Sequence, residues 1–331
     1  MFTYVSFNEF GKERIKKLAE IWNNEFGFIF PITPELLYRN TYGTFGFMAE
    51  HSFIVLEENN PVGYVINKVW QNTEYSENYE GIGWISLIYV QRDKRCLGIG
   101  SELLKLSLDT FKSLGIQRVQ LGKDYQNFFP GLPKDFKEHL GWFQKRGFES
   151  PGETNDLIHY VSNVDKFQFK PYKDGKNYEI RFMNKNDCAS LVSFMRKNFP
   201  GRWVIELLDY LDHNDNLKEF LICLDEGNNI CGFCRVGHPT TPTNKIGFSL
   251  TWRDRFKKLG GIGPLGVDSE YRKNNIAYNL IIYALNYLKE EGCTEMIIDW
   301  TNILSFYRQF GFEIWKTYYY IERKNLKTED K

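Results

Sequence analysis

The spacing of apolar and polar residues divides the chain into two series of elements that follow the same order. The first series contains predicted strands at 2–5, 52–56, 63–69, 83–90, 118–121 and 157–161, and helices at 12–23, 34–40, 98–114 and 135–146. The second contains strands at 178–182, 219–224, 230–236, 263–267, 295–299 and 317–321, and helices at 186–198, 203–211, 275–291 and 303–310. The shared order indicates an internal repeat.

A polar, turn-rich segment at 162–178 separates the two series and is the predicted linker. The chain has 331 residues, which is long for one hydrophobic core and sufficient for two of about 150 residues each. We therefore predict an α/β (α+β) protein with two domains, residues 1–165 and 176–331.

Charge and composition restrict the class of partner. Lys and Arg together number 42, as do Asp and Glu, so neither nucleic acid nor an anionic membrane is the expected partner. Six scattered cysteines favour a reducing compartment. The start of the chain has no signal-peptide pattern, and no apolar run approaches the roughly 18 residues of a membrane span. We expect a cytoplasmic protein.

One cysteine pair has the spacing of a metal or redox motif. Cys231 and Cys234 form a C-x-x-C, with Cys223 and His238 as the nearest further ligands. The segment has the pattern of a strand, in which residues three apart point to opposite faces. We therefore interpret these cysteines as ordinary strand residues and predict no metal.

The segment 95–101 joins a predicted apolar strand to a predicted helix through Gly98 and Gly100. Glycines allow close approach of the backbone to a ligand, and the free amides of a helix N-terminus bind anions. A dinucleotide fingerprint is absent because Leu103 takes its third glycine position, and no G-K-[S/T] follows. Spacing alone leaves open a phosphate loop and a turn without ligand.

Two motifs add a resemblance to a known family. Arg95-x-x-Gly98-x-Gly100 resembles the R/Q-x-x-G-x-G/A loop of the GNAT superfamily of acyl-CoA N-acyltransferases, and residues 143–148 resemble its Y-x-x-x-G-F. Residues 267–277 and 307–312 repeat both motifs in the second series. The resemblance implies two tandem GNAT folds, each a mixed, mostly antiparallel sheet flanked by helices. The tandem architecture is similar to that of mycothiol synthase.

The resemblance implies acetyl-CoA, or a related acyl-CoA, as co-substrate in the first domain. The loop would wrap the pyrophosphate, and the strand before it would hold the pantetheine arm. The implied cofactor-binding residues are Ile88, Tyr89, Val90, Arg95, Cys96, Leu97, Gly98, Ile99, Gly100 and Ser101. A small-molecule or peptide amine would attack the thioester, whose carbonyl a backbone N–H near Tyr89 or Val90 polarises. We expect a monomer, because tandem domains can mimic a dimer.

Each half departs from the family pattern at a different position. In the second loop Asn275 replaces Gly98; asparagine tolerates the turn, but its side chain would crowd a pyrophosphate. In the first half Phe143 replaces the tyrosine that in the family often protonates the departing thiolate. Tyr125 and Tyr307 are the candidate catalytic residues, although Tyr307 is equally well explained as a packed core aromatic.

Two questions about the site stay open at the level of sequence. The aromatic, proline-containing segment 124–133 is an insertion relative to the second half, and we favour a wall of the acceptor pocket over a cover for the domain interface. The general base is unassigned, with Glu80, His51 and His139 as options.

Three rival functions also remain. They are catalysis in the second domain through Tyr307, acyl-CoA binding without catalysis, and aminoacyl transfer of the peptidoglycan type. The intact Arg95–Gly100 loop disfavours the last of these, because aminoacyl transferases of that type generally lack it. The neutral charge also disfavours it, because tRNA binding favours basic surfaces.

Overall fold

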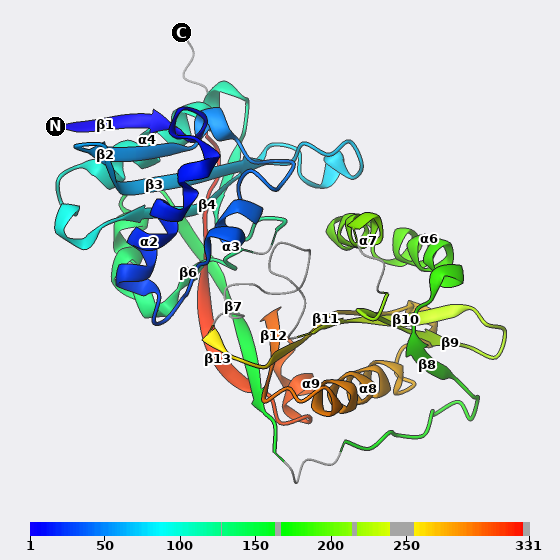
Figure 1. Cartoon of the computed structure of the whole chain (residues 1–331). Coiled ribbons are helices and arrows are strands. Elements are labelled where there is room, and N and C mark those ends of the chain that lie inside the picture. Colours follow the sequence, from blue (N-terminus) through cyan, green and yellow to red (C-terminus); the bar gives the residue numbers. More distant parts are fainter. Residues whose placement is uncertain (127, 163–166, 214–216, 239–254, 327–331) are drawn as a thin grey trace. The chain divides into compact units, whose positions relative to one another are not determined.

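The computed structural model of the chain describes residues 1–126, 128–162, 167–213, 217–238 and 255–326 (Figure 1). These residues form two compact units. The first unit contains residues 1–154, 255 and 316–326, and the second contains the described residues between 155 and 315 that remain. The domain boundaries at residues 165 and 176 stay a prediction, because each compact unit combines segments from separate parts of the chain.

The first unit is built around one sheet with helices on both faces. Its elements are β1 (Phe2–Ser6), α1 (Phe7–Phe10), α2 (Ile15–Phe26), α3 (Pro34–Arg39), β2 (Phe53–Glu57), β3 (Asn60–Val69), β4 (Ile82–Val90), α4 (Ile99–Ser113), β5 (Arg118–Leu121), β6 (Leu132–Pro133) and α5 (Leu140–Gln144). The strand order is β1-β2-β3-β4-β5-β13, in which β4 and β5 run parallel and the other pairs antiparallel. The short β6 pairs with β13 (Glu313–Arg323).

Local sequence explains the helices of this unit. In α2 the apolar residues at helical spacing are all buried: Ile15, Leu18, Ala19 and Trp22. Thr33 caps α3 through its side chain, and Pro34 occupies the first turn, where the missing amide costs nothing. The apolar side of α4 packs with β3 and β4 in one buried cluster that includes Val65, Ile85, Leu103 and Phe111.

The second unit repeats this plan. Its elements are β8 (Glu179–Phe182), α6 (Cys188–Asn198), α7 (Arg202–His213), β9 (Phe220–Leu224), β10 (Ile230–Gly237), β11 (Leu259–Val267), α8 (Ile276–Glu290), β12 (Glu295–Thr301) and α9 (Leu304–Arg308). The strand order is β8-β9-β10-β11-β12-β7, where β7 is Glu149–Tyr160. Figure 1 shows α6 and α7 on one face of this sheet and α8 and α9 on the other.

The two sheets exchange their last strands. The strand β7 comes from the first half of the chain, yet residues 155–160 pair with β12 of the second unit. The strand β13 comes from the end of the second half, yet its residues Ile321–Arg323 pair with β5 of the first unit. Each unit therefore needs a strand from the other half of the sequence to complete its sheet.

The predicted fold class is confirmed, and the predicted elements all occur. The sequence pattern missed the first half of β7 and the two-residue β6, and the predicted helix 135–146 is a 3₁₀ turn over Lys134–His139 followed by α5.

Cys231 and Cys234 are both buried in β10, and the described residues contain no group of three or more metal-ligating side chains. Among these residues no helix is long and apolar enough to cross a bilayer.

Candidate functional site

The strands β4 and β5 separate halfway along β4. Their parallel ladder ends at Ile85 and Leu121, and the amide of Gly122 donates to the Ile85 carbonyl at 2.8 Å. On the β3 side the register shifts at this point, so that Ser86 is an extra residue in β4, a β-bulge. Beyond the bulge, the edge of β4 that faced β5 is open.

The register identifies which backbone groups face this opening. The amide of Gln91 donates to the Val62 carbonyl at 2.9 Å, on the β3 side. Backbone groups alternate in direction along a strand, so the N–H and C=O groups of Ile88 and Val90 point toward the open edge. A ligand that lies between β4 and β5 meets the peptide groups of Ile88 and the amide of Val90 there, whereas the Val90 carbonyl accepts from Arg95.

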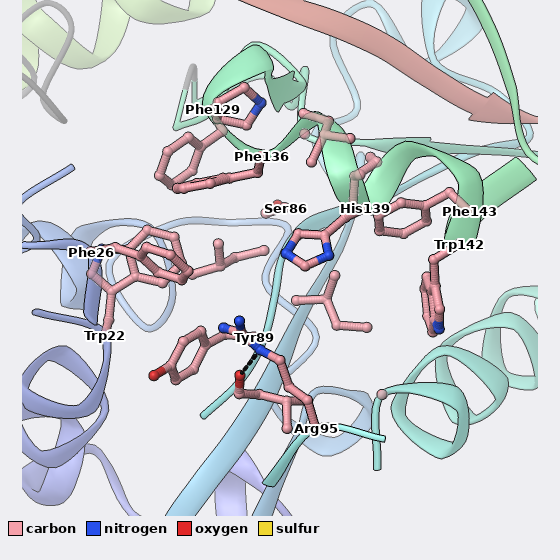
Figure 2. A pocket seen from close by; sticks show the side chains of 18 of the residues that line it. Trp22, Phe26, Ser86, Tyr89, Arg95, Phe129, Phe136, His139, Trp142 and Phe143 are labelled. Carbon is pink, nitrogen blue, oxygen red and sulfur yellow. Dashed lines mark hydrogen bonds between the residues drawn. The ribbon is translucent and has the colours of Figure 1, made fainter. Parts of the chain in front are cut away.

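A cavity of about 340 Å³ occupies the opening. Its walls come from α2, β4, the loop after β4, the start of α4, the segment after β5, and α5. The lining residues are Trp22, Phe26, Ser86, Leu87, Ile88, Tyr89, Val90, Arg95, Cys96, Gly98, Gly100, Ser101, Leu121, Gly122, Phe129, Gly131, Leu132, Pro133, Phe136, His139, Trp142 and Phe143. Figure 2 shows the labelled aromatic side chains around it.

The loop before α4 forms the mouth of the cavity. Cys96 and Gly98 have φ angles of 63° and 86°, in the left-handed region that glycine adopts without strain. Gly98 is the N-cap of α4, and no side chain caps this end. The amides of Ile99, Gly100 and Ser101 in the first turn consequently have no partner within the helix, and the helix dipole favours an anion beside them.

Arg95 holds the loop against the strand. Its Nε donates to the Val90 carbonyl at 3.0 Å, and its Nη2 donates to Oε1 of Glu25 at 2.7 Å. The hydroxyl of Tyr89 lies 3.2 Å from Oε2 of the same Glu25 and donates to the Ile21 carbonyl at 2.8 Å. The Arg95 charge is therefore balanced within the protein, and the backbone amides are what the loop offers to a phosphate.

A second arginine lies at the first turn of α4. Arg146 donates from Nη2 to Oγ of Ser101 at 2.9 Å and from Nη1 to the Trp142 carbonyl at 3.0 Å. Its guanidinium carbon lies 3.9 Å from the centre of the Trp142 ring. Sequence analysis did not single out Arg146, because it occupies a variable position of the Y-x-x-x-G-F motif.

Most of the predicted cofactor residues meet at this cavity. Ile88, Tyr89, Val90, Arg95, Cys96, Gly98, Gly100 and Ser101 line it, whereas Leu97 and Ile99 do not. The Leu97 side chain is exposed, and Ile99 is buried in the core under α4. The aromatic residues that complete the wall, such as Trp22 and Phe26, carry no local sequence signal.

The insertion after β5 contributes part of the wall. Phe129, Gly131, Leu132 and Pro133 line the cavity, whereas Asn127 lies outside the described residues. The start of the insertion is fixed by Asp124, whose Oδ2 lies 2.9 Å from Nζ of Lys68; both side chains are fully buried.

The two tyrosines predicted as catalytic lie elsewhere. Tyr125 is buried and does not line the cavity; its ring stacks on Phe45 at 4.5 Å, and its hydroxyl accepts from Thr44 at 3.3 Å. Tyr307 lies on α9 in the second unit, where it is 8% exposed and packs against Phe312. Burial raises the pKa of both phenols.

The loop of the second unit keeps the turn that sequence analysis predicted for it. Lys273 and Asn275 have φ angles of 64° and 63°, and Arg272 donates from Nε to the Val267 carbonyl at 3.1 Å. The Asn275 side chain, however, donates to the carbonyl of Pro171 in the linker at 2.8 Å. In the second unit, therefore, the linker contacts this loop. The equivalent loop of the first unit opens onto the cavity instead.

Comparison with known proteins identifies the family. The family model for the acetyltransferase (GNAT) family matches residues 15–129 and 188–312, which is most of the chain in two separate regions. The chain therefore belongs to the GNAT family of acetyltransferases, and it contains two such regions in tandem. An uncharacterized N-acetyltransferase, YhbS of Escherichia coli K12, is 25% identical over 128 residues, covering 39% of this chain and 69% of that protein.

Solved structures share the fold over nearly the whole chain. A glucosamine N-acetyltransferase region of a fungal multi-domain GH3 β-N-acetylglucosaminidase matches with a TM-score of 0.81 and 19% identity over 97% of this chain and 38% of that one. This chain thus spans well under half of that relative. A tandem GNAT protein from the clavulanic acid biosynthesis pathway matches with a TM-score of 0.66 and 11% identity over 100% of both chains.

Proposed function

We propose that the first unit binds acetyl-CoA, or a related acyl-CoA, in the cavity between β4 and β5 and transfers the acyl group to an amine. The observation that carries this proposal is the continuity of two features: the glycine turn with free helix amides at the mouth, and the open edge of β4 behind it. The pyrophosphate binds the turn, and the pantetheine arm pairs with the peptide groups of Ile88 and the amide of Val90.

The bulge marks the expected position of the thioester. At Ser86 the two strands have just separated, so an arm that enters from the loop ends there. A backbone N–H of β4 that faces the opening, such as that of Ile88, then polarises the thioester carbonyl. The Ser86 hydroxyl is 2% exposed and has no hydrogen-bond partner among the described residues, so it is available to the same group.

The acceptor enters from the aromatic side of the cavity. Trp22 and Phe129 lie 5.8 Å apart and Phe26 and Phe136 lie 4.6 Å apart, measured between ring centres, and all four line the wall. No described lining residue is acidic. This wall suits an amine attached to an apolar or ring-shaped body, and glucosamine, named for one structural relative, is the first acceptor to test.

Acetyl-CoA binding by calorimetry tests the proposal with a matched pair of variants. Gly100→Trp and Ala277→Trp place the same side chain at equivalent positions of the two loops. A Cβ at Gly100 would meet only ordinary contacts, at 3.6 Å from Trp142, so the fold should tolerate the change. We expect Gly100→Trp to abolish binding and Ala277→Trp to preserve it. A wild-type protein that does not bind acetyl-CoA would refute the proposal.

A second candidate function places the chemistry in the second unit. Tyr307 keeps the hydroxyl that Phe143 lacks, and this is the one observation in its favour. It requires acyl-CoA to enter beside Asn275, whose side chain binds the linker. Loss of binding in Ala277→Trp alone would favour this candidate and make Tyr307 the acid.

The remaining predictions about partners belong to this proposal. We propose that the acceptor is a small molecule or a peptide, that nucleic acid is not bound, and that the chain works as a monomer in the cytoplasm. Size-exclusion chromatography with light scattering measures the oligomeric state directly.

A further inference from the structure

One lining side chain of the cavity, the imidazole of His139, has no part in the binding proposed above. His139 directly precedes α5, with helical backbone angles, and Phe143 is four residues further along. Both residues line the cavity. Residues four apart on a helix lie on the same face, so the imidazole reaches the cavity from the side on which Phe143 stands. Figure 2 shows the His139 ring directed into the space between the lining residues.

Three other polar side chains of the lining are already engaged. Arg95 is bonded to Val90 and Glu25, and the Tyr89 hydroxyl donates to a carbonyl of α2. The Ser101 hydroxyl accepts from Arg146. None of them is free to take and release a proton during acyl transfer.

Cys96 and Ser86 are excluded for other reasons. Cys96 is exposed on the loop at the mouth, far along the chain from the bulge where the thioester is expected. The Ser86 hydroxyl is well placed to donate a hydrogen bond, but an unactivated hydroxyl does not hold a second proton near neutral pH. Among the described lining residues, His139 alone has an acid–base pair in the physiological range.

The surroundings of His139 favour its neutral form. Burial lowers the pKa of the imidazole, and the Arg95 guanidinium lowers it further. Glu138, next to it in the chain, and Glu25, on α2, act in the opposite direction and do not cancel the effect. A neutral imidazole is the form that accepts a proton from an attacking amine.

We propose that His139 carries the proton during acyl transfer in the first unit. It thereby protonates the departing thiolate, which Phe143 cannot do because it lacks a hydroxyl. This inference rests on the proposed function. The amine nitrogen attacks the thioester carbon, forming the C–N bond, and gives a proton to the unprotonated ring nitrogen. As the C–S bond breaks, the imidazolium gives that proton to the sulfur. The products are the amide and the CoA thiol, and His139 is neutral again.

The test does not depend on the acceptor, because the product CoA carries the reacting sulfur. The ultraviolet absorbance of the thiolate follows the titration of CoA bound to wild type, to His139→Gln, and to His238→Gln in the second unit as a control. The neutral imidazole beside the sulfur accepts the thiol proton, so that the resulting thiolate and imidazolium form an ion pair. We expect His139→Gln to raise the pKa of the bound thiol by about one unit or more, and His238→Gln to leave it unchanged.

Calorimetry on the same variants separates the possible outcomes. We expect His139→Gln to bind acetyl-CoA within about threefold of wild type. Unchanged thiol titration with intact binding would overturn the role of His139, and so would loss of acetyl-CoA binding in His139→Gln, which would make it a binding residue. Failure of the wild type to bind would refute the proposed function itself.

With glucosamine as probe acceptor, a second readout is the pH profile of kcat. In wild type kcat should fall as pH drops through the lowered pKa of His139, because the protonated ring cannot accept the amine proton. In His139→Gln this acid limb should be absent and kcat lower by about 10²-fold or more. An identical acid limb in the variant would assign the titration to another group.

Discussion

At the scale of single residues, the two loops differ in the residue that caps the following helix. Gly98 and Asn275 both cap a helix in the left-handed region, and asparagine is among the few other residues that adopt it readily. The consequence of the change can therefore be tested without disturbing the turn.

Gly98→Asn gives the first loop the N-cap residue of the second. A Cβ at position 98 meets nothing within 4 Å, so the fold should be retained and Tm should change little. The side chain would lie where we propose that the pyrophosphate binds. We expect the Kd for acetyl-CoA to rise about tenfold or more by calorimetry, which corresponds to about 1.4 kcal/mol. An unchanged Kd would show that phosphate does not approach this glycine.

The buried pair Lys68–Asp124 makes a prediction about stability. Burial lowers the pKa of Lys68, and the nearby Asp124 opposes that shift. Lys68→Met leaves a carboxylate buried without its cation, which should lower the free energy of unfolding by about 3–5 kcal/mol in urea titrations. The double variant Lys68→Met/Asp124→Leu should recover most of this loss. A double variant as unstable as the single one would contradict the pairing.

The sequence predicted the contiguous part of the site well and the scattered part poorly. The residues from Arg95 to Ser101 are adjacent in the chain, so one motif describes them. Trp22 and Phe129 reach the same cavity from separate elements, and nothing in their local spacing distinguishes a cavity wall from a core. The place of Tyr125 just after β5 suggested a site residue, but its side chain is buried and does not line the cavity.

At the scale of elements, the linker behaves as a part of the second unit. The side chain of Asn279 on α8 accepts from the Lys170 amide at 2.9 Å and donates to its carbonyl at 2.9 Å. Asn274 accepts from the amides of Lys173 and Asp174 at 2.6 and 3.0 Å. The side chains of Asn274 and Asn279 thus form hydrogen bonds with the linker backbone, as a neighbouring strand would in a sheet.

Asn279→Leu tests this attachment. The Asn279 side chain is 1% exposed, so leucine leaves two backbone groups of Lys170 unpaired at a cost of about 1–3 kcal/mol each at most. We expect faster amide exchange at Lys170 and Lys173 and faster tryptic cleavage after Lys173, with acetyl-CoA binding in the first unit preserved. Unchanged cleavage would show that other contacts suffice to hold the linker.

The exchange of β7 and β13 explains where sequence analysis reached its limit. A period of two in hydrophobicity predicts that a segment is a strand, and it did so for both. It contains no information about which of two similar sheets will accept that strand. Each sheet has room for one further strand at the equivalent position. The sequence pattern is therefore satisfied whether β7 joins the first sheet or the second, and side-chain packing decides the outcome.

At the scale of the whole molecule, the exchange predicts that the first half cannot work alone. A chain of residues 1–165 contains the entire cavity lining but lacks β13, the antiparallel partner of β5. Leaving β5 as an edge strand exposes apolar surface beside the site. We expect this fragment to show no acetyl-CoA binding by calorimetry, and co-expression with residues 166–331 to restore it. A fragment that binds as tightly as the full chain would contradict this.

The order in which a ribosome makes these strands gives the exchange a further consequence. After β5 has been synthesised, nearly two hundred residues must follow before β13 exists, which takes roughly 10–40 s at ordinary elongation rates. During this time the nascent first half exposes an unfinished sheet, which is a natural substrate for chaperones. A chain that is released before β13 lacks the partner of β5, so we expect binding only where that strand is supplied, by the same chain or by a second fragment.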